Sequence, residues 1–235
     1  MFYKLSNTAK LSDFEHEFGL QFEYPNVYKP EYIINGLRES NIPVITMNDP
    51  KKIRYAIWGL LPSSFEDNWR VYQDLTNTLN VDLKNLDQYN SIYAEALNER
   101  RCLVVVTGFF TSALYNGKMY PYHIHLANHN PFCIAGIYNQ WEDGFITCSI
   151  LVNKVNNSLE KIPNIFDYEP VVISKNDKNH WLNTGDSYEG VQPLVSSKKI
   201  FNFQSQPISK PLYDKGMLNI DIVDNVDFQN RLKTS

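Results

Sequence analysis

Residues 102–152 read CLVVVTGFFTSALYNGKMYPYHIHLANHNPFCIAGIYNQWEDGFITCSILV. Short runs rich in β-branched and aromatic residues, each bounded by Pro, Gly, Asn or Asp, cover residues 103–110, 122–126, 132–138 and 145–152. Runs of this kind predict strands, and the pair Asn116-Gly117 predicts a tight hairpin turn between the strands that flank it. Consecutive strands joined by short turns indicate a mainly antiparallel sheet.

The rest of the chain adds further strands and only a few helices. Strand-like runs recur at residues 44–46, 55–58 and 171–173, and helical patterns at 67–79, 89–97 and from 174 to about 182. The residues SDFE at 12–15 resemble a capping box for a short N-terminal helix that ends at Gly19. Because strands outnumber helices without regular alternation, we expect an α+β fold of mainly antiparallel sheets with a few flanking helices.

The chain of 235 residues is long enough for one large domain. It contains no internal repeat, low-complexity run or Gly/Ser-rich linker. We therefore expect a single domain over residues 1–218, followed by a short polar tail over residues 219–235.

The composition is that of a folded protein rather than a disordered chain or a coiled coil. Apolar residues make up 43% and aromatic residues 14%, and the formal net charge is −4. A nucleic-acid partner would therefore need a local patch of positive charge. The apolar run 102–113 is much shorter than the roughly 20 residues that span a bilayer, and the N-terminus lacks a secretory signal, so we expect no membrane contact and a cytoplasmic location.

Few residues match the familiar patterns of cofactor or metal sites. His123 and His125 would share one face of a strand, but no acidic third ligand lies nearby, so we expect no metal and no cofactor. The three cysteines lie in or beside strand-like runs without CxxC spacing and are expected to be buried free thiols. The basic pairs 100–101 and 198–199 are interpreted as solvated surface charge.

Several phrases, in a characteristic order and spacing, point to a known family. They are WGLLP at residues 58–62, TLN at 78–80, RRCLV at 100–104 and GFF at 108–110. PYHI at 121–124, AG at 135–136 and PVVI at 170–173 continue the series. Over about residues 1–200 the chain resembles the SRAP family, the SOS-response-associated peptidases or abasic-site processing proteins. The resemblance implies an SRAP-like barrel or sandwich and a role in the DNA damage response.

In that family, removal of the initiator methionine frees a cysteine whose amine and thiol close a thiazolidine ring on an abasic site in single-stranded DNA. An Asn holds the sugar, a Glu acts as acid and base, and a His assists ring opening. The resemblance therefore implies four functional positions in the present chain.

Three of those positions carry other residues here. Phe2 stands at the cysteine, Thr111 at the Glu and Pro163 at the His, whereas Asn80 matches the Asn. With a shorter loop Phe166 would take the His position, and Asn90 is the less suitable match for the Asn. Because none of the replacements moves a proton at neutral pH or supplies a thiol, and because a bulky second residue normally keeps Met1 in place, we expect no covalent capture.

Two family arginines that contact phosphate are also replaced. Asp82 and Tyr168 occupy their positions, and Glu169 adds a carboxylate, so any affinity for single-stranded DNA is expected to be weak. The candidate DNA contacts are Trp58, Pro62, Phe65, Asn80, Phe109 and Phe110. Core packing is the alternative for Trp58 and the phenylalanines, and a turn or cap role is the alternative for Asn80.

Together these observations predict a catalytically degenerate SRAP homologue that acts without a covalent bond. Two alternatives remain open at this point. One is an active enzyme that uses a different residue set, such as Thr111, Asn80 and His123, for crosslinking, lyase or peptidase-like chemistry. The other is a pseudoenzyme that binds a protein partner and has no affinity for DNA.

Overall fold

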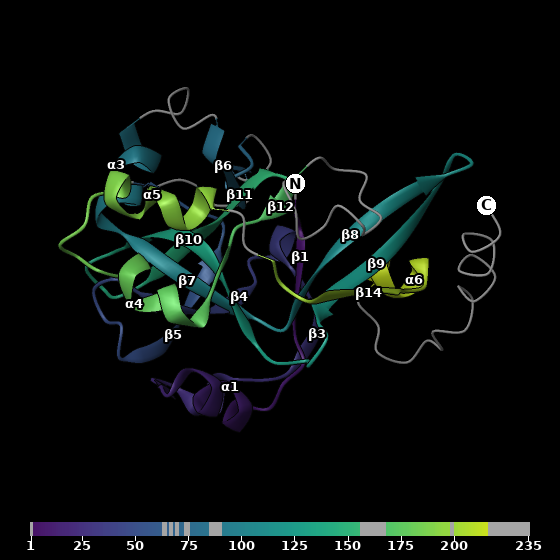
Figure 1. The fold of residues 1–235 in the computed structure, drawn as a ribbon, viewed down its shortest axis with the longest axis horizontal. Helices are drawn as coiled ribbons and strands as arrows, with labels where there is room; N and C mark the ends of the chain where they lie inside the picture. Colours follow the sequence, from purple (N-terminus) through teal and green to yellow (C-terminus); the bar gives the residue numbers. More distant parts are fainter. Residues whose placement is uncertain are drawn as a thin grey trace.

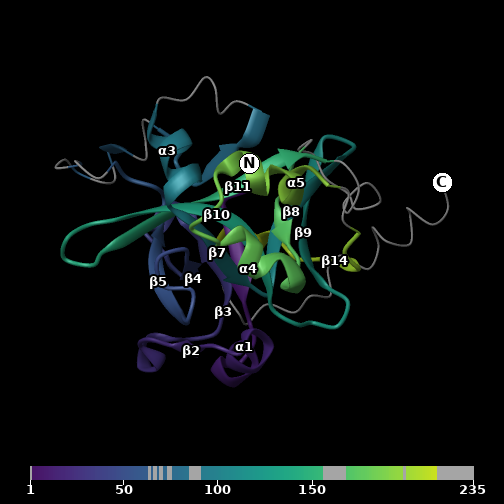
Figure 2. The ribbon, with the colours of Figure 1, turned by 60° about the vertical axis from the view of Figure 1, so that its left-hand side comes forward.

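The computed structural model describes residues 2–62, 65, 68, 71–72, 76–84, 91–155, 168–197 and 200–215. Two β-sheets form the body of the described chain (Figure 1). Helices lie at its margins, with α1 (Leu11–Phe18) at one end and α3 (Ser91–Glu99) at the other in two views (Figures 1 and 2). This confirms the predicted α+β class.

The first sheet contains five antiparallel strands in the order β14-β9-β8-β1-β3. Their bounds are β14 (Phe203–Pro207), β9 (Lys118–Leu126), β8 (Gly108–Tyr115), β1 (Lys4–Asn7) and β3 (Glu31–Asn35). The N-terminal strand is thus an inner strand, with β8 on one side and β3 on the other.

The β8–β9 hairpin forms at the predicted turn. Asn116 and Gly117 both adopt positive φ angles, 48° and 72°, which the two central residues of a type I′ turn require. Asparagine and glycine tolerate this conformation better than other residues. The hairpin extends to the right of the molecule in Figure 1, together with β14.

The second sheet follows the order β12-β11-β10-β7-β4-β5-β2. Its strands are β12 (Tyr168–Pro170), β11 (Ile146–Lys154), β10 (Phe132–Gln140), β7 (Arg101–Val106), β4 (Asn41–Thr46), β5 (Lys52–Trp58) and β2 (Gln21–Phe22). β13 (Val172–Ile173) pairs with β10, and β6 (Asn80–Asp82) runs parallel to β11. Because β5 also pairs with β11, the strands β11, β10, β7, β4 and β5 form a ring. This ring is the barrel-like part of the fold.

The remaining elements are short. They are α4 (Lys178–Trp181), α5 (Tyr188–Ser196), α6 (Lys210–Lys215) and the 3-10 turns η1 (Pro25–Val27), η2 (Gly36–Arg38) and η4 (Lys175–Asp177). The helices predicted at 89–97 and after residue 174 are confirmed by α3 and by η4 with α4. The helix predicted at 67–79 lies partly outside the described residues; within it, residues 71–72 are helical and residues 77–79 are not.

The capping residues of α1 differ from the prediction. The helix begins at Leu11, and the Asp13 carboxylate accepts a hydrogen bond from the Lys10 N–H at 3.0 Å. Glu15, expected to close the box, instead accepts from the Phe22 N–H at 3.3 Å. The cap therefore lies two residues earlier than predicted, while Gly19 ends the helix with a φ of 65° as expected.

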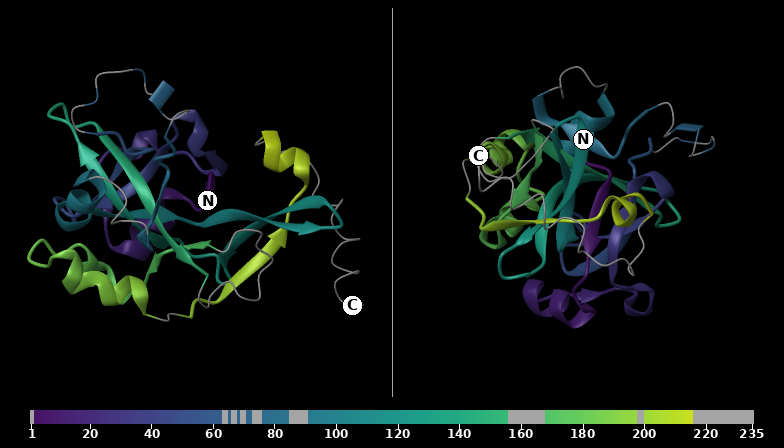
Figure 3. Two further views of the ribbon diagram at one scale, coloured as in Figure 1. Left: turned by 90° about the horizontal axis from the view of Figure 1, so that it is seen from above. Right: turned by 90° about the vertical axis from the view of Figure 1, so that its right-hand side faces the viewer.

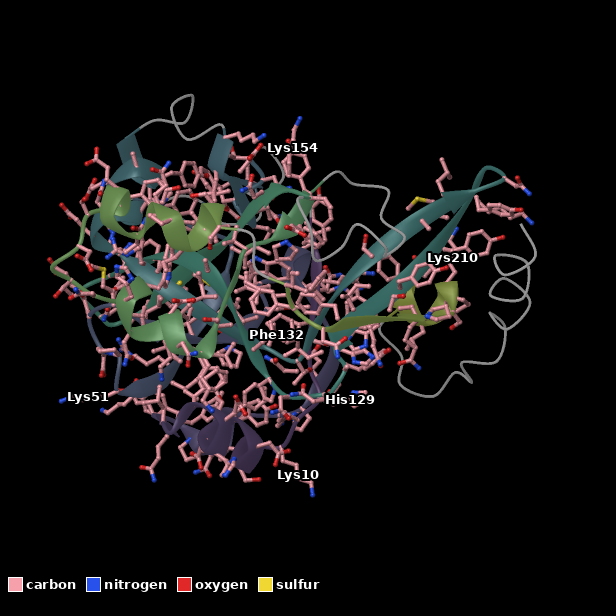
Figure 4. All side chains as sticks on the ribbon, in the orientation of Figure 1. Lys10, Lys51, His129, Phe132, Lys154 and Lys210 are labelled. Carbon is pink, nitrogen blue, oxygen red and sulfur yellow. The ribbon has the colours of Figure 1, made fainter. Side chains whose placement is uncertain are left out.

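Aromatic rings fill the space between the two sheets. Phe132, labelled near the centre of Figure 4, lies 6.4 Å from the Phe109 ring and 5.5 Å from the Phe203 ring, centroid to centroid. Cys102, Cys133 and Cys148 are buried free thiols, as predicted. Burial raises the pKa of the Cys133 thiol to about 12, so this thiol stays protonated at neutral pH.

Arg101 is fully buried, which corrects its interpretation as solvated surface charge. Its guanidinium donates hydrogen bonds to five backbone carbonyl oxygens, those of Leu97, Asn98, Trp181, Asn183 and Asp186, at 2.7–3.1 Å. Its neighbour Arg100 is partly exposed and forms an ion pair with Glu95 at 2.9 Å. Arg101 thus joins the end of α3 to the end of α4.

None of the helices in the described part of the chain has the length and apolar character needed to cross a bilayer.

Candidate functional site

The backbone of residue 2 is held by the side chain of Asn80. The Phe2 N–H donates to Asn80 Oδ1 at 3.0 Å, and Asn80 Nδ2 donates to the Phe2 carbonyl oxygen at 2.8 Å. Asn80 is 8% exposed and begins β6. The two residues are 78 positions apart in the sequence, so this reciprocal pair fixes the start of the chain against the second sheet.

The WGLLP segment places Asn80 in this position. Trp58 Nε1 donates to the Leu79 carbonyl at 2.9 Å, and the Leu60 N–H donates to the Thr78 carbonyl at 3.2 Å. These bonds fix the two residues that precede Asn80. The Trp58 side chain has no exposed surface and packs beside Leu79 and Gly36.

The Phe2 side chain belongs to the core. It is 1% exposed, and its ring meets the Phe109 ring edge-on at 5.5 Å between centroids. Residue 2 therefore presents no nucleophilic side chain beside Asn80. Phe109 is fully buried and Phe110 is 3% exposed, so these rings, like Trp58, offer no face on which a base could stack. Trp58, Phe109 and Phe110 therefore pack in the core, which was the alternative to a contact with DNA.

Thr111 and His123 do not meet in one site. Thr111 is 1% exposed and follows Phe110 on β8, whereas His123 pairs with Phe110 across the hairpin. Because successive side chains on a strand alternate between faces, Thr111 and His123 point to opposite faces of the sheet. Joint catalysis by these two residues therefore has no support in the geometry.

His123 is held in its neutral form. Its Nε2 lies 2.7 Å from Ser6 Oγ, and Gly108, which has no side chain, leaves room for this contact. Burial, with smaller contributions from His125 and His129, lowers the pKa of His123 to about 3. His125 lies 5.3 Å from His123 and stacks on His129 at 4.5 Å, ring centroid to ring centroid. In the part of the chain that the structure describes, no three potential ligands are placed to hold a metal ion.

Pro62 and Phe65 are half-buried, and the structure adds aromatic neighbours that the sequence analysis missed. Phe65 lines a shallow pocket of about 330 Å³ with Leu61, Trp141 and Phe145. The Trp141 and Phe145 rings are 5.3 Å apart at the turn between β10 and β11. In the sequence, the signal for this pocket was the presence of two aromatic residues, Trp141 and Phe145, at the turn between two predicted strands. Glu39 and Asp143 give the rim of this pocket negative charge.

Asp82 and Tyr168, which stand where the resemblance implies arginines, contact each other. The Tyr168 hydroxyl donates to Asp82 Oδ2 at 3.0 Å, because β12 and β6 both pair with β11 near Val152. Glu169 lies next to Tyr168 on β12. One carboxylate, that of Asp82, therefore lies where the resemblance implies a cation, whereas Glu169 points to the opposite face of the strand. Pro163 and Phe166 lie outside the described residues.

A crystal structure of a protein from Bacteroides thetaiotaomicron has the same fold, with a TM-score of 0.76 at 22% identity over 91% of this chain and 94% of that chain. A second, from Bordetella bronchiseptica, has a TM-score of 0.70 at 11% identity over 89% and 100%. The model of the SOS response associated peptidase (SRAP) family matches residues 1–214. The chain belongs to the SRAP family.

Two curated relatives in Bacillus subtilis support this assignment. YoqW, an abasic site processing protein, is 24% identical over 181 residues, which cover 74% of this SRAP chain and 77% of the relative. YobE, which has the same description, is 25% identical over 186 residues, or 77% and 81% of the two chains. The present SRAP protein is thus a homologue of abasic-site processing proteins, with phenylalanine at position 2.

Proposed function

We propose that this SRAP protein recognises abasic sites in single-stranded DNA without forming a covalent bond. The observation that carries the proposal is the state of residue 2. Asn80 still holds its backbone, but its side chain is a phenyl ring buried against Phe109. A hydrocarbon ring cannot attack the aldehyde of an abasic site, so the position supports recognition but not capture.

The substrate class comes from the relatives. YoqW and YobE are described as abasic site processing proteins, and this chain shares their family over nearly all of its described length. Asn80 contributes one further amide hydrogen beyond the hydrogen bond to Phe2, because a primary amide has two. That hydrogen is a donor for the sugar of an abasic nucleotide.

The aromatic pocket supplies a surface for the neighbouring bases. Phe145 is 41% exposed and Trp141 is half-buried, and both line the pocket with Phe65. Stacking of a base on an exposed aromatic ring contributes about 1–3 kcal/mol and tolerates any sequence. Affinity would remain weak, because Glu39 and Asp143 lie in the same pocket and repel phosphates.

A comparison of native and denaturing gels tests the proposal. The purified protein is incubated with a single-stranded oligonucleotide that carries one abasic site, and with the same strand intact. We expect a salt-sensitive complex on the native gel, stronger with the abasic strand, and no adduct on the denaturing gel. The intact mass of the protein reports whether Met1 is retained.

An adduct that survives denaturation and depends on the native N-terminus would instead support an active enzyme. No complex on either gel, even at low salt, would support the third function, a pseudoenzyme for a protein partner. The net charge of −4 favours that third function over an enzyme acting on DNA.

A further inference from the structure

Helix α6 covers the outer face of the five-stranded sheet beside the N-terminal strand. The segment before it pairs with β9 through β14, and Lys210, labelled in Figure 4, marks its first turn. The right-hand view of Figure 3 shows α6 close to β1. Its apolar contacts form a small cluster separate from the main core, made of Ile33, Phe110, Ile208 and Leu212.

Helix α6 also contacts Lys4, the one cationic residue of β1. The Lys4 ammonium donates to the Tyr213 carbonyl oxygen and lies 3.7 Å from the centre of the Tyr213 ring. Burial lowers the pKa of Lys4, the carboxylate of Asp214 opposes this effect, and the guanidinium of Arg38 adds to it. Lys4 and Arg38 are therefore close enough to repel each other, with α6 placed over them.

The charges around Lys4 depend on the presence of α6. A cavity of about 140 Å³ is lined by Lys4, Arg38, Glu31, Tyr213 and Asp214, among others. With α6 in place, two cations face two carboxylates. Without α6, Asp214 is absent, and Lys4 and Arg38 face Glu31 alone. The uncovered site would carry a net positive charge and a polar rim suited to an anion.

We propose that Lys4 and Arg38 form a phosphate-binding site for single-stranded DNA, and that α6 covers this site as a competitor within the same chain. The proposal rests on the proposed function and adds its regulation. Lys4 is two residues from Phe2, which Asn80 holds, so its Cα lies about 7 Å further along the strand. Lys4 lies on the face of the sheet that carries Phe110 and Tyr213, whereas the Phe2 ring lies on the Phe109 face, so a strand bound at Asn80 would reach Lys4 around the start of β1.

The covering contact and the phosphate exclude each other. The Tyr213 carbonyl and the Tyr213 ring contact the same ammonium that a phosphate would bind, and the Asp214 carboxylate in the same cavity attracts it. Because β14 tethers α6 to the sheet, the helix competes at a high effective concentration. DNA must displace it before Lys4 contributes to binding.

The test releases α6 in the full-length chain without changing its charge. Leu212→Ser with Tyr213→Ser removes the apolar contact of the helix and the ring over Lys4. The matched control is Leu114→Ser with Met119→Ser, which removes two exposed apolar side chains at the tip of the β8–β9 hairpin. Both proteins are titrated with the abasic oligonucleotide by fluorescence anisotropy at several salt concentrations.

The released protein should bind about three- to tenfold tighter than the parent and the control. Its salt slope should steepen by about 0.7 for each additional phosphate of the single strand that a cationic side chain neutralises. Adding Lys4→Gln to the released protein should abolish the tighter binding. Comparison of the parent, the released protein, Lys4→Gln and the combined variant forms a double-mutant cycle that isolates the contribution of Lys4. Equal affinities and slopes in the parent and the released protein would overturn the covering role but leave the proposed function intact.

A second variant keeps the proposal falsifiable if the released protein fails to fold. Asp214→Asn removes the competing carboxylate, and Glu189→Gln on the exposed face of α5 is its charge-matched control. Asp214→Asn should tighten binding about two- to threefold beyond the control. An equal increase in affinity for both variants would show that the effect comes from net charge alone and would contradict the proposal. Absence of DNA binding in every protein would overturn the proposed function as well.

Discussion

We expect residue 2 to affect both the chemistry proposed for this protein and its stability. Phe2→Cys would remove a buried ring and leave a void against Phe109, so we expect a loss of about 2–4 kcal/mol in the free energy of unfolding. The same variant should not capture abasic DNA efficiently, because Thr111 supplies no carboxylate. Denaturant unfolding and the rate of adduct formation on denaturing gels measure the two effects.

Phe2→Leu is the control, because it keeps an apolar side chain and adds no thiol. Rapid crosslinking by Phe2→Cys alone would show that the other lost positions are unimportant for catalysis. Adding Thr111→Glu and Pro163→His to Phe2→Cys should raise the adduct yield non-additively, as groups that act together do.

His123 predicts how stability depends on pH. Its pKa is about 3 in the folded chain and about 6.5 in the unfolded chain. Above pH 6.5 both states are neutral, and the residue contributes no pH dependence. As the pH falls from 6.5 towards 3, only the unfolded state binds a proton, so stability decreases by about 2 kcal/mol at about pH 5. Urea unfolding across this range measures the loss.

The variant His123→Gln should flatten that profile, because glutamine takes up no proton. His16 is exposed on α1, and His16→Gln should leave the profile close to that of the parent. Identical profiles for the parent and for His123→Gln would contradict the assignment of a neutral, buried imidazole.

At this scale, the sequence predicted the site in part. The resemblance assigned Asn80 and residue 2 to one site, and in the structure the Asn80 amide bonds to the backbone of Phe2. The resemblance did not show that both the oxygen and the nitrogen of the Asn80 amide bond to the backbone of Phe2. It also did not show that Trp141 and Phe145 form a pocket with Phe65. Contacts between residues so distant in the chain depend on sheet register, which local patterns do not encode.

Among the structural elements, α3 and α4 depend most on one buried side chain. Arg101→Lys replaces a fork of five donors by one ammonium with three, so several buried carbonyls lose their partner. We expect a loss of about 3–5 kcal/mol in the free energy of unfolding. Guanidinium chloride unfolding followed by tryptophan fluorescence reports it, because Trp181 adjoins the arginine.

Arg100→Lys provides the matched control one residue away. Arg100 pairs with Glu95 at the surface, where such pairs contribute about 1 kcal/mol or less. Equal losses of stability for the two variants would mean that the hydrogen bonds of Arg101 contribute no more to the free energy of unfolding than the surface ion pair of Arg100.

The elements that the sequence predicted are those with a strong local signal. The β8–β9 hairpin follows from Asn116-Gly117, and the strands of residues 102–152 follow from their β-branched runs. α5 was missed because Pro193 lies inside it and weakens its helical pattern. β14 and α6 were missed because their stability comes from contacts with β9 and Phe110 rather than from their own sequence.

On the scale of the whole molecule, we expect the net charge of −4 to weaken binding to a nucleic acid. Asp82 and Tyr168 hydrogen-bond to each other where the family resemblance implies arginines. Asp82→Arg with Tyr168→Arg should tighten binding to abasic single-stranded DNA and steepen the salt slope by about 0.7 for each phosphate that the new arginines neutralise. Anisotropy titrations at several salt concentrations measure both quantities.

The control Asp49→Arg with Tyr24→Arg makes the same change of charge at other surface positions. It should raise affinity only through the general field and leave the slope nearly unchanged. An equal response from both pairs would show that the surface at Asp82 and Tyr168 does not meet DNA, and a partner-binding pseudoenzyme would then be favoured.

The inner position of β1 has a consequence for biosynthesis. β1 pairs with β8, and the Asn7 side chain accepts a hydrogen bond from the Thr107 N–H, 100 residues further along the chain. At a translation rate of roughly 5–20 residues per second, about 5–20 seconds separate the emergence of these partners from the ribosome. The β8 edge of β1 has no partner during that interval, so β1 is synthesised well before it can be enclosed.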